Sequence, residues 1–328
     1  MKSIQGKVRQ SNFELLRIIT MLLVVATHVN FYSLGWPTSD DMATEPSTTI
    51  AKLFFESLTI CCVNVFVLIS GWFGIRPSWG KFRRFIFQCF FFSFGILIAA
   101  ILFNKVTIGP SLLKEIAISL TLKDYWFIPS YILLYLLSPV LNAFVDSGTK
   151  KTLGSIVLCF FIFEFIYGWV YSLNGFNSGY TTISFIGLYL LGRYLRKYPC
   201  SLTQLKPSVD FFIYFLVGVI NTIACIVMLK HGHTINRFFY YTCPFVVIQS
   251  IFLLLSFSKI KFTSKTVNYI ASSAIAVFLF HWNHLVRPQF TAIANQLFSN
   301  YDWGGVFLND YSLYLDNICS FRPHRSTA

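Results

Sequence analysis

Charged residues are scarce in this sequence. They make up 12% of its 328 residues, whereas a soluble domain carries roughly 25%. Acidic residues are the rarer sign, with 13 Asp and Glu against 26 Lys and Arg, while hydrophobic residues reach 55%. The shortage of charge excludes an ordinary soluble domain and a disordered chain, so the composition predicts an integral membrane protein.

Metal-ligand and disulfide patterns are also missing. The eight cysteines form no CxxC pair and no zinc-type spacing, and most of them lie inside apolar runs. Cysteines in such runs behave as small hydrophobic side chains with a free thiol. The sequence therefore predicts neither a disulfide framework nor a metal site.

A cleavable leader is not predicted either. The opening residues MKSIQGKVRQ precede an apolar run, as in a signal peptide, but Arg17 interrupts that run and no small-x-small cleavage site follows. A signal peptide has an uninterrupted apolar region ahead of such a site. We therefore expect this run to be a retained first membrane span.

What the sequence does contain is a series of apolar segments long enough to cross a bilayer, which takes about 20 residues. Nine segments qualify: 13–34, 52–74, 84–104, 125–145, 152–172, 180–197, 209–229, 236–257 and 268–287. A tenth stretch, 303–321, contains Asp310 and Asp316, each costing about 2.5–3.5 kcal/mol near the centre of a span. We expect no independent tenth span there unless these acids lie near its ends or face a polar cavity. The predicted fold is a single all-α domain over residues 1–328, a polytopic bundle of nine to ten transmembrane helices.

The net charge of +13 lies mostly in alternate short loops, which argues against nucleic-acid binding. One set of loops carries the cations Lys2, Lys7, Arg9, Arg76, Lys81, Arg83, Lys150, Lys151, Arg193, Arg196, Lys197, Lys206, Lys259, Lys261 and Lys265. The intervening loops are poorer in them, and the first of these holds Asp40, Asp41 and Glu45. Cytoplasmic loops carry the excess of Lys and Arg, so the pattern predicts a cytoplasmic N-terminus.

Three ionisable residues fall in the first span, in the stretch ELLRIITMLLVVATH. Arg17 and His28 are eleven residues apart, which at 100° per residue leaves them about 20° apart around the helix and about 16 Å apart along it. Glu14 lies one turn before Arg17 on the same stripe. Ionisable groups in a span usually face a bundle interior and mark function. The alternative is that Glu14 and Arg17 are interfacial anchors and His28 is a hydrogen-bonded packing residue.

Five stretches, taken together and in order, resemble acyltransferase family 3, whose first helix carries an Arg, ten residues and a His. Besides ELLRIITMLLVVATH they are CCVNVFVLISGWFGI, KFRRF, YWFIPSYILLYLLSPVLN and SSAIAVFLFH. The resemblance covers residues 10–290. The family usually ends in a clean final span, and residues 291–328 depart from that pattern.

The resemblance implies a membrane O-acyltransferase of the plasma membrane. Family members most often transfer acetyl from cytoplasmic acetyl-CoA to a hydroxyl of a surface polysaccharide or its lipid-linked precursor. His28 is then the base that removes the hydroxyl proton, or the transient carrier of the acyl group, because imidazole both takes up and returns protons near neutral pH. Arg17 is expected to hold the pantetheine or thioester region.

Other polar residues are candidates for binding the two substrates. Lys81, Arg83 and Arg84 are expected to bind the nucleotide end of CoA, because guanidinium groups match phosphate oxygens. An ordinary positive-inside loop explains this cluster almost equally well. The weaker candidates for acceptor binding are Glu14, Glu56, Trp126, Tyr131 and His281. Trp126 also suits an interfacial anchor, and His281 with His284 and His28 has no ligand spacing that indicates a metal.

Two other functions compete with acyl transfer. A transporter or flippase would also need charges inside the membrane, but it predicts internal repeats or paired broken helices, and the sequence indicates neither. A polysaccharide polymerase would need a large aqueous loop, whereas connections here are no longer than residues 105–124. The Arg17–His28 pair on one helix favours a reaction centre.

Overall fold

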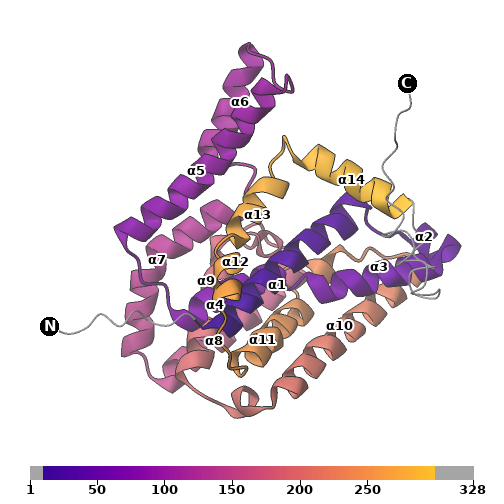
Figure 1. Ribbon diagram of the computed structural model, residues 1–328. Helices are drawn as coiled ribbons and strands as arrows, with labels where there is room; N and C mark the ends of the chain where they lie inside the picture. The colour runs from indigo at the N-terminus through magenta and orange to yellow at the C-terminus, as the bar shows by residue number, and fades with distance from the viewer. Residues whose placement is uncertain (1–9, 300–328) are drawn as a thin grey trace.

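The structure is a computed structural model that describes residues 10–299, and this part of the chain is helical with no strand (Figure 1). Seven of its helical segments are long and apolar enough to cross a membrane. They are Ser11–Ser33, Pro46–Phe73, Trp79–Leu102, Phe127–Ser147, Lys150–Val170, Pro207–Lys230 and Asn236–Ser258. The predicted all-α, multi-pass character is confirmed.

The predicted count of nine to ten spans is not confirmed, because two segments differ from the expectation. Segment 180–197 forms α9 (Thr182–Lys197), whose 16 residues reach about 24 Å, short of a hydrocarbon core of about 30 Å. Segment 268–287 is broken into α12 (Lys265–Ala271) and α13 (Ala274–His281), and α14 (Arg287–Ser299) follows. Hydropathy averages over such a break and does not detect it. The stretch 303–321 lies outside the described residues.

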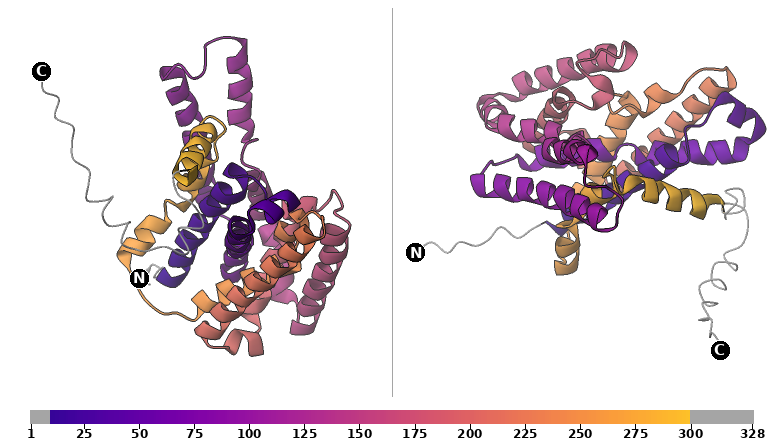
Figure 2. Two further views of the ribbon diagram at one scale, coloured as in Figure 1. Left: turned by 90° about the vertical axis from the view of Figure 1, so that its right-hand side faces the viewer. Right: turned by 90° about the horizontal axis from the view of Figure 1, so that it is seen from above.

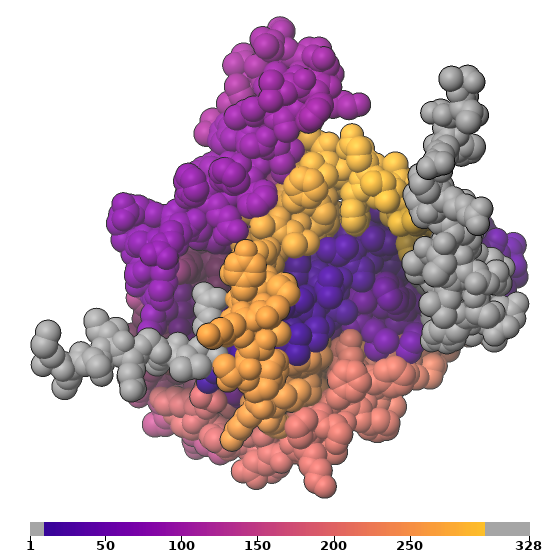
Figure 3. Space-filling model, in the orientation of Figure 1, coloured from indigo at the N-terminus to yellow at the C-terminus, as the bar shows by residue number. Residues whose placement is uncertain are grey.

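Helix α1 (Ser11–Thr27) packs against α4 (Cys62–Phe73), α12 and α13, and it continues as the π-helix η1 (His28–Ser33). Figures 2 and 3 show this indigo segment beside the orange segment that contains α12 and α13, and part of it is uncovered on the face drawn in Figure 3. Side-chain bonds fix its first turn, since Ser11 Oγ donates to Asn268 Oδ1 at 2.9 Å and Asn12 Nδ2 donates to the Phe257 carbonyl at 2.9 Å. The segment that carries the predicted ionisable stripe is therefore central to the fold.

The second span is interrupted between α3 (Pro46–Thr59) and α4 (Cys62–Phe73). Backbone carbonyls that lose their helical hydrogen bonds inside a membrane need other donors. Here α10 (Pro207–Lys230) and α11 (Pro244–Ser258) supply them. Tyr214 Oη donates to the Leu58 carbonyl at 2.5 Å, and Gln249 Nε2 donates to the Ser57 carbonyl at 2.9 Å. The break is thus built into the packing of these helices.

Helices α4 and α9 approach each other closely through two glycines. A Cβ atom on Gly71 would lie 2.3 Å from the Tyr189 carbonyl oxygen, and one on Gly192 would lie 2.6 Å from the Leu68 carbonyl oxygen. Small residues allow helix backbones to come this near in membranes. The buried helix α9 is held in the core by this contact.

The remaining elements complete the bundle and its connections. Helix α6 (Pro110–Thr121) lies in the connection 105–124, and with α5 (Trp79–Leu102) it projects from the bundle in Figure 1. The elements are α2 (Ser39–Thr44), α5 (Trp79–Leu102), α6 (Pro110–Thr121), α7 (Phe127–Ser147), α8 (Lys150–Phe163), η2 (Glu164–Val170), η3 (Asn177–Gly179), η4 (Ser201–Gln204) and η5 (Asn236–Phe239).

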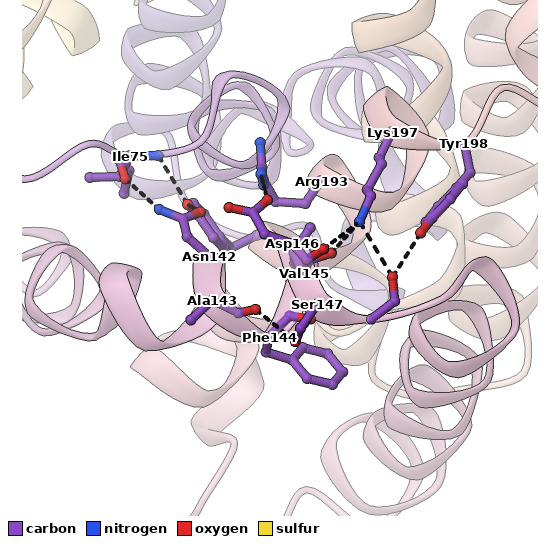
Figure 4. Close-up of polar contacts among 12 residues, drawn as sticks. Ile75, Asn142, Ala143, Phe144, Val145, Asp146, Ser147, Arg193, Lys197 and Tyr198 are labelled. Atoms are coloured by element: carbon purple, nitrogen blue, oxygen red, sulfur yellow. Dashed lines mark hydrogen bonds and ion pairs between the residues drawn. The ribbon is translucent and has the colours of Figure 1, made fainter.

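Cation-rich loops meet at one end of the bundle, called here the basic end, where residues 74–78, residues 145–149 and the last turns of α9 lie together. Figure 4 shows Arg193, Lys197 and Tyr198 contacting the end of α7 there. Lys197 donates to the carbonyl of Val145, where α7 ends and leaves carbonyls without helical partners. Arg193 Nη2 pairs with Asp146 Oδ1 at 3.1 Å, and Tyr198 Oη donates to the Gly148 carbonyl at 2.9 Å. Three of the loops predicted to face one side of the membrane therefore meet at one end, and the cytoplasmic location of that side stays a prediction.

Candidate active site

One face of α1 borders a cavity of about 270 Å³. The lining residues on this helix recur at the 3.6-residue period, as expected for a single stripe. The cavity is lined by Arg17, Met21, Val24, Thr27, His28, Cys62, Val63, Phe66, Ser70, Phe85, Trp126, Phe127, Tyr131, Tyr241, Ala271, Ser272, Ala274, Ile275 and Phe278. The stripe with Arg17 and His28 thus faces a cavity.

Arg17 lies at the end of this cavity nearest the start of α1, one third exposed. Its Nη1 donates to Glu14 Oε1 at 2.6 Å, and its guanidinium lies 6.0 Å from the centre of the Phe73 ring. Glu14 is itself buried and does not line the cavity. Glu14 therefore orients Arg17, which leaves the remaining guanidinium donors for an anionic or carbonyl group.

His28 lies at the transition from α1 to η1, three helical turns from Arg17. A π-helical turn is uncommon and often occurs at functional sites. The His28 ring stacks on Trp282 at 3.7 Å between centroids with an interplanar angle of 20°. Its Nδ1 lies 2.9 Å from Nε2 of His281, whose Nδ1 lies 2.6 Å from the Val277 carbonyl. The His28 imidazole is therefore held at Nδ1 by His281 and on one face by Trp282.

The η1 turn is held by another buried carboxylate, Glu56, which does not line the cavity. Asn30 Nδ2 donates to Glu56 Oε2 at 3.0 Å and to the Lys52 carbonyl at 2.9 Å. Lys52 Nζ in turn donates to the carbonyls of Leu34 and Gly35, at 3.0 and 2.8 Å, beyond the end of η1. Glu56 thus supports the segment that presents His28, in place of the predicted contact with an acceptor.

Aromatic side chains form the wall opposite α1. Trp126 packs against Tyr180 at 4.3 Å and Tyr241 at 5.8 Å between ring centroids. Tyr131 stacks on Phe127 at 5.5 Å, and its Oη lies 3.1 Å from Ser70 Oγ. Both predicted aromatic candidates border the cavity, where their rings offer flat apolar surface beside hydroxyl groups.

The predicted CoA-binding cluster lies next to the cavity and not in it. Lys81, Arg83 and Arg84 are exposed on the first turns of α5, whereas Phe85 lines the cavity. Ser78 caps this helix by accepting from the Lys81 amide at 3.3 Å. The cluster therefore sits at the basic end, on the helix that borders the cavity.

Sequence reasoning missed two residues beside His28. Trp282 stacks on its ring, and the Arg287 guanidinium lies 5.2 Å from the centre of the Trp282 ring. The only signal for Trp282 in the sequence was its position directly after the motif SSAIAVFLFH. Within residues 10–299, no three His, Cys, Asp or Glu side chains are grouped so as to hold a metal ion.

His284 forms a separate contact, which fastens the end of α13 to α6 and to the start of α7. Its Nδ1 pairs with Asp124, and its Nε2 lies 2.5 Å from Glu115 Oε2. Next to it, Tyr125 Oη donates to the Leu279 carbonyl at 2.7 Å. The hydrogen bond to Asp124, and secondly the one to Glu115, raises the pKa of His284 above its usual 6.5.

This contact should weaken as the pH rises. Because folding raises the pKa of His284, its stabilising contribution is fully present below about 6.5 and is lost as the pH rises through the higher folded value. The pair is partly exposed, so the effect is about 1 kcal/mol or less. Amide hydrogen exchange of α6, corrected for its intrinsic pH dependence, should accelerate up to about fivefold above that pH. A His284→Gln protein should lack this step, and an identical step in both proteins would contradict the assignment.

Comparison with known proteins gives one match. A family model described as an acyltransferase domain, that of acyltransferase family 3, matches residues 10–307. The match continues past residue 290, where the resemblance was expected to end, and includes α14. No curated protein and no solved structure matches this chain.

Proposed function

Because the chain belongs to acyltransferase family 3 and forms a bundle of apolar helices, it is a membrane acyltransferase, and we propose that it transfers acetyl from acetyl-CoA to a sugar hydroxyl. The acceptor in this proposal is a cell-surface polysaccharide or its lipid-linked precursor. The protein would act in the plasma membrane, with its basic end and N-terminus in the cytoplasm, where acetyl-CoA is made.

The observation that supports the proposal is the shared cavity of Arg17 and His28. A cation at one end of a cavity and an imidazole farther along it suit a reaction between a charged donor and a neutral alcohol. Two such groups in a span are costly unless a cavity or partners accommodate them, and here both are present.

The reaction needs one base and no redox partner. The acceptor oxygen attacks the thioester carbonyl carbon while its proton passes to His28, and the new C–O bond forms as the C–S bond breaks. The proton then passes from His28 to the departing CoA thiolate, which restores the neutral imidazole. In the alternative route His28 first accepts the acetyl group itself and then releases it to the alcohol.

Arg17 and the exposed cations of α5 would hold the donor. The Arg17 guanidinium is proposed to bind the thioester or pantetheine region from inside the cavity. Lys81, Arg83 and Arg84 would bind the phosphates outside it, because fork-shaped guanidinium groups bind phosphate oxygens in pairs. Trp126 and Tyr131 would stack on the acceptor sugar.

Reversing the charge of Arg83 and Arg84 together is expected to weaken CoA binding by about 10–100-fold, since a charge-assisted hydrogen bond contributes roughly 1.5–3 kcal/mol. The matched control is the Lys150→Glu, Lys151→Glu protein, which changes the same charge at the same end on α8. Titration of the purified proteins with CoA measures the effect. Unchanged affinity in the α5 variant, or an equal loss in the control, would refute phosphate binding by this cluster.

A transporter or flippase is the second candidate, because two apolar segments in the described part of the chain are broken beside the cavity. Cys62 and Val63 begin α4 after one break, and Ala271 and Ser272 border the other; all four line the cavity. Broken helices are typical of transporter binding sites. The structure thus contains a feature that the sequence did not reveal.

One assay separates the two functions. Membranes with and without the protein are supplied with acetyl-labelled acetyl-CoA and candidate glycan acceptors, and label in the glycan is measured. Protein-dependent labelling of the glycan with release of free CoA is expected. Movement of glycan without any consumption of the thioester would favour the transporter and overturn the acyl-transfer proposal.

A further inference from the structure

His281 has no nitrogen left for an acceptor sugar. It is 6% exposed, and both ring nitrogens already have partners. Nε2 lies 2.9 Å from Nδ1 of His28, and Nδ1 lies 2.6 Å from the carbonyl oxygen of Val277, one turn earlier in α13. Its environment therefore points to a role that acts through His28.

The chain of contacts determines where the protons are. A carbonyl oxygen only accepts hydrogen bonds, so Nδ1 of His281 must carry a proton and donate it to Val277. A neutral His281 then has no proton on Nε2 and accepts there. The bond at 2.9 Å consequently requires a proton on Nδ1 of His28, which leaves the lone pair of neutral His28 on Nε2.

The reverse arrangement is disfavoured. For Nδ1 of His28 to accept, His281 would need protons on both nitrogens and would be a buried cation. The Arg287 guanidinium already packs on the Trp282 ring that stacks against His28. Burying a second cation there without a carboxylate partner is costly.

We propose that His281 is a positioning residue that fixes the tautomer of His28, so that Nε2 is the atom that takes the acceptor proton. The stack on Trp282 fixes the plane of the ring, and His281 fixes its edge. When Nε2 of His28 takes up a proton, the charged ring still donates through Nδ1 to Nε2 of the neutral His281. The Val277 carbonyl, which accepts from Nδ1 of His281, polarises that acceptor. Residues that orient the imidazoles of metal sites commonly contribute about 10- to 100-fold, and a contribution of the same order is expected here. This inference rests on the proposed role of His28.

The test compares three substitutions at position 281. In His281→Gln, the side-chain oxygen lies where Nε2 was and accepts from His28, so the rate should fall less than about fivefold. In His281→Asn the shorter amide does not reach His28, and in His281→Leu nothing accepts. Both should lose on the order of 100-fold in kcat, with KM for acetyl-CoA nearly unchanged. Since Asn is polar and Leu is apolar and large, a shared loss is not explained by packing alone.

Two further measurements separate the possible outcomes. Nitrogen NMR of the histidine-labelled protein should show the Nδ1-protonated tautomer of His28 in the unsubstituted and Gln proteins, and loss of this preference in the Asn and Leu proteins. Asn or Leu proteins that keep full kcat would overturn the inference even if His28 is essential. A His28→Ala protein that keeps full transfer would instead overturn the proposed function. An Nε2-protonated His28 in the resting protein would overturn the tautomer assignment directly.

Discussion

Replacing His28 with alanine should lower acetyl transfer by about 10²–10⁴-fold, the range that a general base contributes. The alcohol attacks poorly while it keeps its proton, and no other described side chain of the cavity can accept one at neutral pH: Arg17 is always charged, and the cysteine, serine, threonine and tyrosine groups are protonated. The loss should fall on kcat, because in the proposed mechanism CoA is held mainly by cations elsewhere.

The matched control for this experiment is His233→Ala, which removes an exposed imidazole from the loop after α10. Initial rates with labelled acetyl-CoA, together with size-exclusion profiles in detergent, should show equal folding and a rate loss only in the His28 protein. The His28→Gln protein tests the chemistry further, since an amide fills similar space but is not a base. If either His28 variant transfers acetyl at the control rate, His28 is not the base.

Replacing Gly71 with alanine should destabilise the whole bundle. The new Cβ would lie 2.3 Å from the Tyr189 carbonyl oxygen and 3.0 Å from the Tyr189 Cα, which are backbone atoms and do not rotate away. Overpacking costs about 1–3 kcal/mol even where side chains yield. A shift of α9 would also disturb Tyr189 Oη, which accepts from the Ile75 amide at 2.9 Å and donates to Asn142 Oδ1 at 2.7 Å.

Thermal unfolding in detergent measures this effect, with a lower midpoint of at least several degrees expected for Gly71→Ala. The control is Gly95→Ala in α5, where a Cβ meets nothing within 4 Å. That change should be neutral or slightly stabilising, because alanine is the better helix former. Equal midpoints for the two proteins would show that α4 and α9 separate without cost.

The sequence predicted the central part of this structure because helical periodicity is a local property. Once residues 13–34 are expected to be helical, the directions of Arg17 and His28 follow from their spacing. The structure confirms that both face one cavity. Composition likewise predicted apolar helices, since each span carries its own hydrophobicity.

The partners of the site were not predictable in the same way. His28 and His281 are 253 residues apart, and nothing in one sequence states which late helix packs against the first. The breaks at Ile60–Cys61 and Ser272–Ser273 contain neither Pro nor Gly, so no local signal marks them. Glu56 was predicted to bind the acceptor because the sequence does not show its hydrogen bond to Asn30, which forms only through tertiary packing.

The wide separation of the two histidines along the chain affects biosynthesis. During translation α1 enters the membrane with its imidazole long before α13 exists, and helices as short as α12 and α13 gain most of their stability from packing on neighbours already in place. A nascent chain therefore holds an unpaired His28, whose ring can carry its proton on either nitrogen. In the proposed mechanism, full reactivity therefore arises only after α13 has been made and has docked against α1.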